Sequence, residues 1–192
     1  MNQSQNAATQ SDENIAMRPM KKLRILIVAG EPSSDHHGAA VVERIRAMAP
    51  NVEIVGMGGG ALRDAGVTTI VDSETSGSIM GITEVLRHIP KILQSFNLLV
   101  AEVDRQKPDL AILIDFPDFN LRLAKKLAKR GVRVLYYISP QLWAWRSGRV
   151  KTMKRTVTKV AAIFPFEEGF YHRHNVDAEY VGHPFMSELP IS

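Results

Sequence analysis

The residues best suited to acid–base chemistry lie in the segment LIDFPDFN, residues 113–120. Asp115 ends a short apolar run, Asp118 follows three residues later, and Asn120 lies just behind it. A carboxylate at the end of a buried strand lies where ligands bind in α/β sheets, and partial desolvation would suit it to act as a general base. The alternative is structural, with Asp118 capping the next helix and Asp115 bonding buried backbone.

A second polar loop, GEPSSDHHG at residues 30–38, follows the first apolar run. Gly30 allows a tight turn, and the start of the next helix offers free N–H groups to a phosphate or a sugar hydroxyl. Ser33 and Asp35 add hydrogen-bonding side chains, although an N-cap role for Ser34 or Asp35 explains them equally well. The loop lacks the GxGxxG pattern, which disfavours a dinucleotide site.

We expect no metal site in this chain. His36 and His37 are adjacent, so their side chains would point in different directions on a helix, and no HExxH pattern accompanies them. The 192 residues include no Cys, which excludes disulfides and thiolate ligands. The two histidines are therefore expected to be ordinary surface residues.

Half of the positive charge lies in one segment. Between Phe119 and Phe166 there are 12 of the 24 Lys and Arg residues and no Asp or Glu, although the net charge of the chain is only +4. Such a block indicates an anionic partner, whether nucleic acid, a phosphorylated ligand or an acidic membrane surface; a solvated helix face is the alternative. Nucleic acid is disfavoured because the bases are spread over two helices and a loop without stacking aromatics.

The elements that must position these residues alternate regularly along the chain. Short apolar runs predict buried strands, and segments with helical spacing separate them. The expected strands are 23–29, 53–57, 68–71, 110–115, 134–138, 160–164 and 179–181, and the expected helices are 36–49, 61–65, a long one from about 82, 121–129, one after 147 and one through 171. Repeated βα units predict an α/β fold with a doubly wound, mostly parallel, Rossmann-like sheet.

The long helix carries an apolar stripe that Pro90 interrupts, so the helix should kink or a new helix should start there. Its first turns place Val85, Leu86 and Ile89 beside basic residues, an arrangement that could accept acyl chains at an interface. Packing into the core is the stronger explanation for the stripe as a whole.

The two ends of the chain differ from its middle. We expect residues 1–20 to be a disordered polar tail, 21–184 to form one domain, and 185–192 to begin a linker. No apolar run approaches the roughly 18 residues that cross a bilayer, and the first 20 residues lack the apolar stretch of a signal peptide. A cytoplasmic location is therefore expected.

Six ordered blocks resemble the lipid-A-disaccharide synthases. They are AGEPSSDHHG (29–38), SIMGITEVL (78–86), LIDFPDFN (113–120), YISPQLWAWR (137–146), FPFEEGFY (164–171) and VGHP (181–184). That family comprises inverting glycosyltransferases of the two-domain GT-B class. They join UDP-2,3-diacylglucosamine to 2,3-diacylglucosamine 1-phosphate, release UDP and form a β-1,6 disaccharide on the way to lipid A.

The resemblance implies a role for each matching residue. Asp115 falls on the family's proposed general base, which would take the proton from the acceptor's 6-hydroxyl. The implied acceptor-site residues are Gly30, Ser33, Asp35 and Asn120, with Arg146 and Arg149 at the 1-phosphate and Val85, Leu86 and Ile89 facing lipid. No metal or other cofactor is implied, because protein donors and helix dipoles can stabilise the diphosphate.

The chain departs from the family pattern in two ways. Ser34 stands where the family usually has Gly, so a position expected to tolerate positive φ carries a side chain, which works against a close approach of the backbone to a ligand there. The family also has a second Rossmann-like domain for the UDP-sugar. We therefore expect this chain to be the N-terminal, acceptor-binding half, folded but inactive alone and peripheral on the inner face of the bacterial inner membrane. The alternatives are a stand-alone module for anionic ligands or nucleic acid, and another GT-B enzyme such as a UDP-sugar epimerase.

Overall fold

The computed structural model describes residues 22–74, 82–142 and 147–184 of the chain. The strands are β1 (Arg24–Ala29), β2 (Glu53–Gly58), β3 (Thr68–Asp72), β4 (Leu110–Ile114), β5 (Arg133–Tyr137), β6 (Lys159–Ala162) and β7 (Ala178–Tyr180). The helices are α1 (Pro32–Met48), α2 (Gly60–Asp64), α3 (Ile82–Gln106), α4 (Pro117–Ala128), α6 (Val150–Thr156) and α7 (Pro165–Arg173), with a 3₁₀ turn η2 (Ser147–Arg149) before α6. All seven expected strands are present within a residue or two of the expected bounds.

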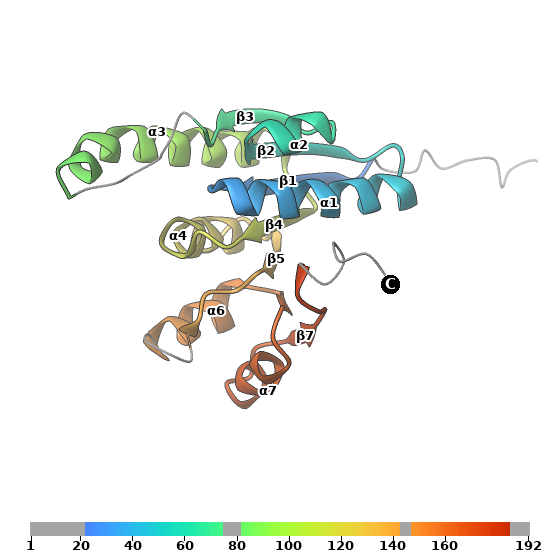
Figure 1. Cartoon of the computed structure of the whole chain (residues 1–192), viewed down its shortest axis with the longest axis vertical. Coiled ribbons are helices and arrows are strands. Elements are labelled where there is room, and N and C mark those ends of the chain that lie inside the picture. Colours follow the sequence, from blue (N-terminus) through green and yellow to red (C-terminus); the bar gives the residue numbers. More distant parts are fainter. Residues whose placement is uncertain (1–21, 75–81, 143–146, 185–192) are drawn as a thin grey trace, which may run out of the picture.

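The strands form one parallel sheet with the order β3-β2-β1-β4-β5-β6-β7. Figure 1 shows this order from β3 at the top to β7 at the bottom. The order reverses between β1 and β4, where Ala29 pairs with Ile114. The expected doubly wound Rossmann-like fold is confirmed, and the loops after β1 and β4 leave the sheet side by side at its topological switch point.

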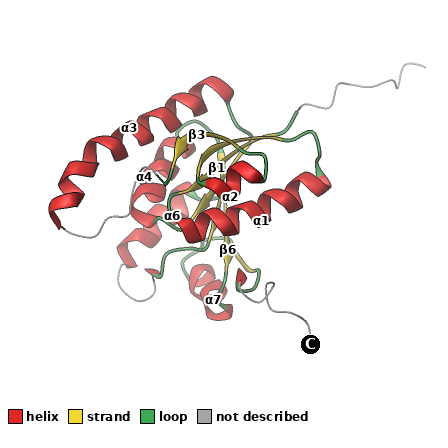
Figure 2. Ribbon diagram, turned by 45° about the horizontal axis from the view of Figure 1, so that its top comes forward, coloured by secondary structure: helices red, strands yellow, loops and turns green. Residues whose placement is uncertain are grey.

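Two helical layers cover the sheet. Alternate residues of β1 face opposite ways: Ile25 and Ile27 pack with α1 and α2, whereas Leu26 and Val28 pack with α3, α4 and α6. Figure 2 shows α3, α4 and α6 on one side of the strands and α1 and α2 on the other. Because both faces are covered, the strands are apolar without the alternation of a half-exposed sheet, as their sequences predicted.

Two helices begin earlier than expected. The polar segments before residues 36 and 121 were predicted to be loops, but α1 starts at Pro32 and α4 starts at Pro117. A proline in the first turn has a backbone already suited to a helix, and small polar residues or acids are favoured there. The candidate polar side chains therefore stand on helix starts, where their positions are fixed.

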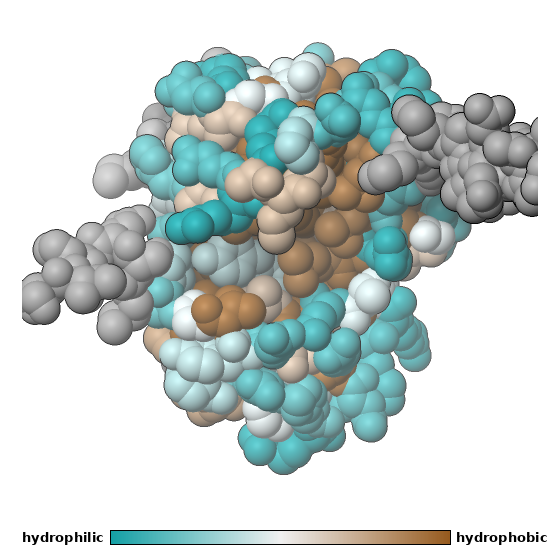
Figure 3. Space-filling view, turned by 90° about the vertical axis from the view of Figure 1, so that its right-hand side faces the viewer, coloured by the Kyte–Doolittle hydropathy of each residue, from teal (hydrophilic) through white to brown (hydrophobic). Residues whose placement is uncertain are grey.

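The long helix is continuous through Pro90, so of the two expected effects of this proline, a kink or a new helix, no new helix starts there. The side chains of Leu99 and Val103 on α3 are buried in the core, whereas those of Leu93 and Leu98 are exposed. None of the helices in the described ranges is long and apolar enough to cross a membrane. Figure 3 shows that hydrophobic surface also remains uncovered in the middle of one end of the domain, between hydrophilic regions.

Candidate functional site

The loops that follow β1 and β4 meet at the switch point. Gly30 directly follows β1, and a Cβ atom placed on it would lie 2.4 Å from Cδ1 of Phe116, which follows β4 by two residues. Only a residue without a side chain allows the two loops to pack this closely. This packing is a structural reason for Gly30 that the sequence did not reveal, and its predicted contact with the acceptor remains a prediction.

Asp115 has an unusual backbone that its neighbours hold in place. Asp115 and Phe116 both adopt left-handed conformations, with φ of 47° and 46°. Its N–H donates to the carbonyl of Tyr137 at 3.1 Å, and its carbonyl accepts from the hydroxyl of Tyr136 at 2.7 Å and from Nδ2 of Asn120 at 2.8 Å. Strained non-glycine residues fixed by several hydrogen bonds cluster at functional sites. These bonds fix the position from which the Asp115 carboxylate projects.

The environment of Asp115 suits a proton acceptor. Burial raises the pKa of its half-buried carboxyl, while a hydrogen bond from the backbone of Phe116 acts in the opposite direction. A base whose pKa lies above the ordinary Asp range is better matched to proton transfer near neutral pH. The position at the switch point and the raised pKa both agree with the role predicted for this residue.

Glu31 is a second carboxyl at this site, and the sequence analysis did not single it out. Burial raises its pKa, and the negative charge of Asp115 raises it further. The two residues are 84 positions apart and meet only because β1 and β4 are neighbours. Asp115 directly follows β4, and Glu31 follows β1 after one glycine. This position just after an apolar strand is the only signal that the two residues share in the sequence.

Asn120 supports the turn that carries Asp115. It is fully buried, and its amide nitrogen donates to the carbonyls of Ile114 at 3.2 Å and Asp115 at 2.8 Å. Its Oδ1 atom has no hydrogen-bond partner among the described residues. Asn120 thus takes the backbone-bonding role that the structural alternative had given to Asp115, and its contact with an acceptor remains a prediction.

Arg149 lies in the same neighbourhood. Its guanidinium forms an ion pair with Asp118 of the first turn of α4. The pKa of the buried Tyr136 hydroxyl is raised well above its usual value, first by burial and then by the charge of Asp115, and the positive charge of Arg149 opposes this effect. Arg149 is therefore close enough to affect Tyr136, whose hydroxyl bonds the Asp115 carbonyl, whereas Arg146 lies outside the described residues.

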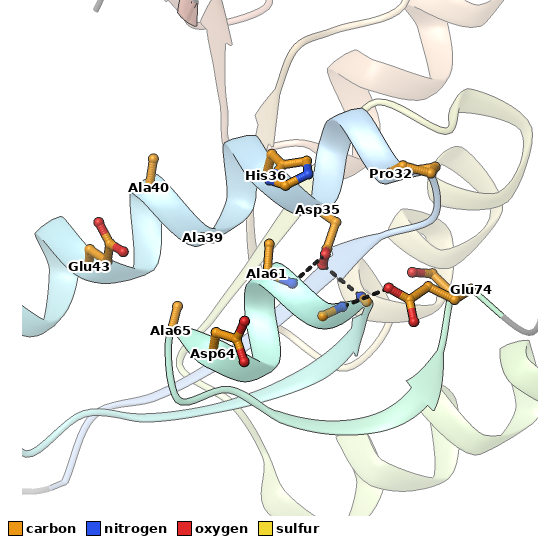
Figure 4. A pocket seen from close by; sticks show the side chains of 13 residues that line it. Pro32, Asp35, His36, Ala39, Ala40, Glu43, Ala61, Asp64, Ala65 and Glu74 are labelled. Atoms are coloured by element: carbon orange, nitrogen blue, oxygen red, sulfur yellow. Dashed lines mark hydrogen bonds between the residues drawn. The ribbon is translucent and has the colours of Figure 1, made fainter. Parts of the chain in front are cut away.

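Asp35 is engaged in a different contact. Its buried carboxylate accepts hydrogen bonds from the N–H groups of Gly59 at 2.6 Å, Ala61 at 2.9 Å and Leu62 at 3.4 Å, and so caps α2 from α1. Figure 4 shows it at a pocket of about 650 Å³ between these helices. Capping of a neighbouring helix was not among the sequence expectations, and the acceptor-site role of Asp35 remains a prediction.

Ser33 and Ser34 differ in their surroundings. Ser33 is exposed on the first turn of α1. Ser34 is buried, and its hydroxyl accepts from the Glu31 N–H at 3.0 Å and donates to the Glu31 carbonyl at 2.8 Å. Ser34 lies within the helix and is not among the left-handed positions, so this position does not use the positive φ that a glycine would tolerate. A serine therefore fits here without backbone strain.

An apolar pocket of about 510 Å³ lies beside this site, between α3 and α4. Its walls come from Ile89, Ile92, Leu93 and Phe96 of α3 and from Phe116, Asp118, Phe119 and Arg122 at the start of α4. The Phe119 ring stacks on Phe116 at 5.1 Å and meets Phe96 edge-on at 5.5 Å. Ile89, one of the predicted lipid-facing residues, thus lines an apolar surface next to Asp115; the side chains of Val85 and Leu86 lie outside the described part of the chain.

The described residues hold no group of three His, Asp or Glu side chains that could bind a metal ion. The switch point brings together two carboxyl groups with raised pKa, a nearby guanidinium and an adjoining apolar pocket. Such a site can accept a proton from a hydroxyl of an amphiphilic, anionic ligand.

Comparison with known proteins agrees with the sequence blocks. The chain is 52% identical over 171 residues to a lipid-A-disaccharide synthase of Koribacter versatilis, covering 88% of this chain and 44% of that protein. It is also 52% identical over 167 residues to a lipid-A-disaccharide synthase of Myxococcus xanthus, covering 87% of this chain and 43% of that protein. The chain therefore spans less than half the length of the curated relatives it matches.

A solved structure supports the fold alone. A UDP-N-acetylglucosamine 2-epimerase superposes with a TM-score of 0.56 at 11% identity, over 81% of this chain and 46% of the other. The Rossmann-like sheet is thus shared with this epimerase, a likeness of fold and not of function. The family model of lipid-A-disaccharide synthetase matches residues 25–192. With this match, and with two relatives at 52% identity, the chain belongs to the lipid-A-disaccharide synthetase family.

Proposed function

We propose that this chain is the acceptor-binding half of a glycosyltransferase. The enzyme transfers 2,3-diacylglucosamine from UDP-2,3-diacylglucosamine to the 6-hydroxyl of 2,3-diacylglucosamine 1-phosphate. One observation carries the proposal: a carboxylate with a raised pKa stands at the switch point, beside an apolar pocket. A proton acceptor and an apolar surface are what a hydroxyl nucleophile on an acylated sugar requires.

Asp115 acts as the general base of this reaction. As O6 of the acceptor forms a bond to C1 of the donor sugar, the hydroxyl proton passes to the Asp115 carboxylate. The bond between C1 and the UDP oxygen breaks, its electron pair leaves with UDP, and the configuration at C1 inverts. Asn120 and Tyr136 do not touch the reacting atoms; they bond the Asp115 carbonyl and so hold the carboxylate in place.

The acceptor is held through its other parts. Its acyl chains enter the apolar pocket that Ile89 and Phe116 line. Val85 and Leu86, whose side chains lie outside the described part of the chain, keep the lipid-facing role that their sequence predicts. Its 1-phosphate binds Arg149 and Arg146, so Asp118 must give up part of its ion pair with Arg149. Gly30, the first turn of α1 with Ser33 and Asp35, and Asn120 of α4 line the same acceptor site.

The donor and its diphosphate bind to a second, C-terminal domain, and the two halves act at the inner face of the inner membrane. Glycosyl transfer therefore needs both domains. On this proposal the 192-residue chain binds the acceptor but does not catalyse transfer by itself, and turnover of UDP-2,3-diacylglucosamine by this chain alone would contradict it.

The test is binding of 2,3-diacylglucosamine 1-phosphate to the purified chain, measured by calorimetry beside UDP. We expect the acylated sugar phosphate to bind and UDP not to bind. Asp115→Asn should retain this binding, because a base acts in the chemical step. In an enzyme that includes the donor domain, the same substitution should lower the transfer rate about 10²- to 10⁴-fold. A folded chain that fails to bind the acceptor would overturn the proposal.

A further inference from the structure

A groove rich in positive charge runs over the outer side of α4, and the proposed reaction does not use it. The groove has a volume of about 760 Å³ and lies between Phe96 of α3 and the side chains of α6. Five cationic side chains line it, and no carboxylate does: Arg122, Lys125, Lys126 and Lys129 from α4, and Arg155 from α6.

The charge of this basic groove is not neutralised within the described residues. None of the five cationic side chains forms an ion pair with another described residue. Two nearby acidic residues are already engaged, since Asp104 of α3 pairs with Arg130 and Asp118 of α4 pairs with Arg149. Like charges gathered on one helix repel one another, so an arrangement of this kind favours an anionic partner.

The basic groove continues into the apolar pocket beside Asp115. The two surfaces share Phe96 and Arg122. Ile89 and Leu93, which line the apolar pocket, expose 41% and 54% of their surfaces. Apolar side chains beside a row of Lys and Arg are the arrangement found on proteins that lie at the boundary between lipid headgroups and acyl chains.

We propose that the basic groove is a docking surface for the anionic headgroups of membrane phospholipids, separate from the site for the acceptor's own phosphate. All five cationic side chains are exposed. Flexible, exposed lysines suit a diffuse layer of headgroup charge, whereas a site for one phosphate would place buried donors around it. With headgroups in the groove, the mouth of the apolar pocket faces the lipid phase from which an acylated acceptor would enter.

This inference rests on the membrane-surface part of the proposed function and adds the site and the lipid class. Its test uses the full 192-residue chain, sedimented with vesicles of phosphatidylcholine alone or with phosphatidylglycerol added, and without any sugar substrate. The groove variant is Lys125→Gln with Lys126→Gln. The control removes two exposed positive charges elsewhere, Arg44→Gln on α1 with Arg133→Gln at the start of β5.

We expect the wild-type chain to bind only the vesicles that contain phosphatidylglycerol, and added salt to weaken this binding. Each headgroup-bound lysine contributes roughly fivefold in affinity, so the groove variant should bind roughly thirtyfold more weakly, and the control should bind nearly as well as the wild type. Circular dichroism checks that both variants fold, and glutamine is close to lysine in helix propensity.

Three results would overturn the inference, and they are distinguishable. If wild type ignores phosphatidylglycerol, the membrane-surface part of the proposed function fails. If groove and control variants lose affinity equally, net charge rather than the groove is responsible. If inorganic phosphate at matched ionic strength displaces the chain from vesicles, the groove is a discrete phosphate site instead of a docking surface.

Discussion

At the scale of single residues, the proposed proton-transfer site depends on backbone strain that buried hydrogen bonds hold in place. Two consecutive left-handed residues, Asp115 and Phe116, together cost a few kcal/mol, because an ordinary side chain crowds the backbone in that region. The bonds from Tyr136 and Asn120 to the Asp115 carbonyl offset this cost. The turn thus presents its carboxylate at the end of β4 instead of allowing it to continue along the strand.

The charges of Glu31 and Asp115 should be coupled in a measurable way. The negative charge of Asp115 raises the pKa of the Glu31 carboxyl, so Asp115→Asn should allow Glu31 to ionise at a lower pH. Carboxyl NMR titration of Glu31 measures the shift. Asp64→Asn, on the exposed side of α2, removes a carboxylate elsewhere and should leave the Glu31 midpoint unchanged. An unchanged midpoint in Asp115→Asn would mean that the two carboxyls do not interact.

Asp115 should also reduce folding stability at neutral pH. Burial raises its pKa in the folded state above that in the unfolded chain, so the folded state binds the proton more tightly. The tighter proton binding stabilises the folded state relative to the ionised form fully at acid pH, and this contribution is lost as the pH rises through the raised pKa. Asp115→Asn should therefore have a higher Tm than wild type at pH 7, and the difference should shrink as the pH falls through the raised pKa and be smallest below about 4. A variant that is less stable at pH 7 would indicate that the carboxylate makes a stabilising contact.

At the scale of elements, the strands were predictable and the helix starts were not. Buried parallel strands such as β1 and β4 are uninterrupted apolar runs, so the sequence alone locates them and places Asp115 at a strand end. The starts of α1 and α4 combine Pro with small polar residues, a composition that loops share. The meeting of Glu31 with Asp115 could not be predicted either, because it follows from which strands are neighbours in the sheet.

The tertiary cap of α2 is the clearest stability element outside the core. Asp35→Ala would leave the N–H groups of Gly59 and Ala61 without their buried acceptor. We expect a loss of about 2 kcal/mol in the free energy of unfolding, which corresponds to a fall in Tm of about 4 to 8 °C for a chain of this size. Thermal unfolding followed by circular dichroism measures the change. The control is Asp64→Ala, which removes an exposed carboxylate from α2.

That measurement also separates the two roles of Asp35. If Asp35 only caps α2, Asp35→Asn should lower the Tm but leave the affinity of the folded chain for the acceptor nearly unchanged. A variant of unchanged Tm that binds 2,3-diacylglucosamine 1-phosphate more weakly would show instead that this side chain contacts the acceptor, as the sequence predicted.

At the scale of the whole molecule, the features brought together at one end of the sheet match the parts of an acylated sugar phosphate. The carboxylate belongs to Asp115 just after β4, and the guanidinium belongs to Arg149 in the segment between β5 and α6. The apolar pocket lies between α3 and α4. These segments are distant in sequence, and the sheet order places them next to one another. A proton acceptor, a positive charge and an apolar wall thus belong to one surface, although each appears in the sequence as a separate motif.

The apolar pocket gives this arrangement a direct test, because α3 offers a matched pair of exposed leucines. Leu93 lines the pocket and exposes 54% of its surface, whereas Leu98, with 47% exposed, does not line it. Both substitutions to Gln place a polar side chain on an exposed helix position, so both should be nearly neutral for folding. Only Leu93→Gln removes apolar surface that an acyl chain would cover, a loss of about 1 to 2 kcal/mol.

We therefore expect Leu93→Gln to weaken binding of 2,3-diacylglucosamine 1-phosphate about tenfold and Leu98→Gln to leave it unchanged. The difference should disappear with glucosamine 1-phosphate, which has no acyl chains and so gains nothing from the pocket. Calorimetric titration of the two ligands into the two variants measures all four affinities. Equal effects of the two substitutions would mean that the acyl chains bind elsewhere on α3 or outside this domain, and the apolar pocket would then have no part in acceptor recognition.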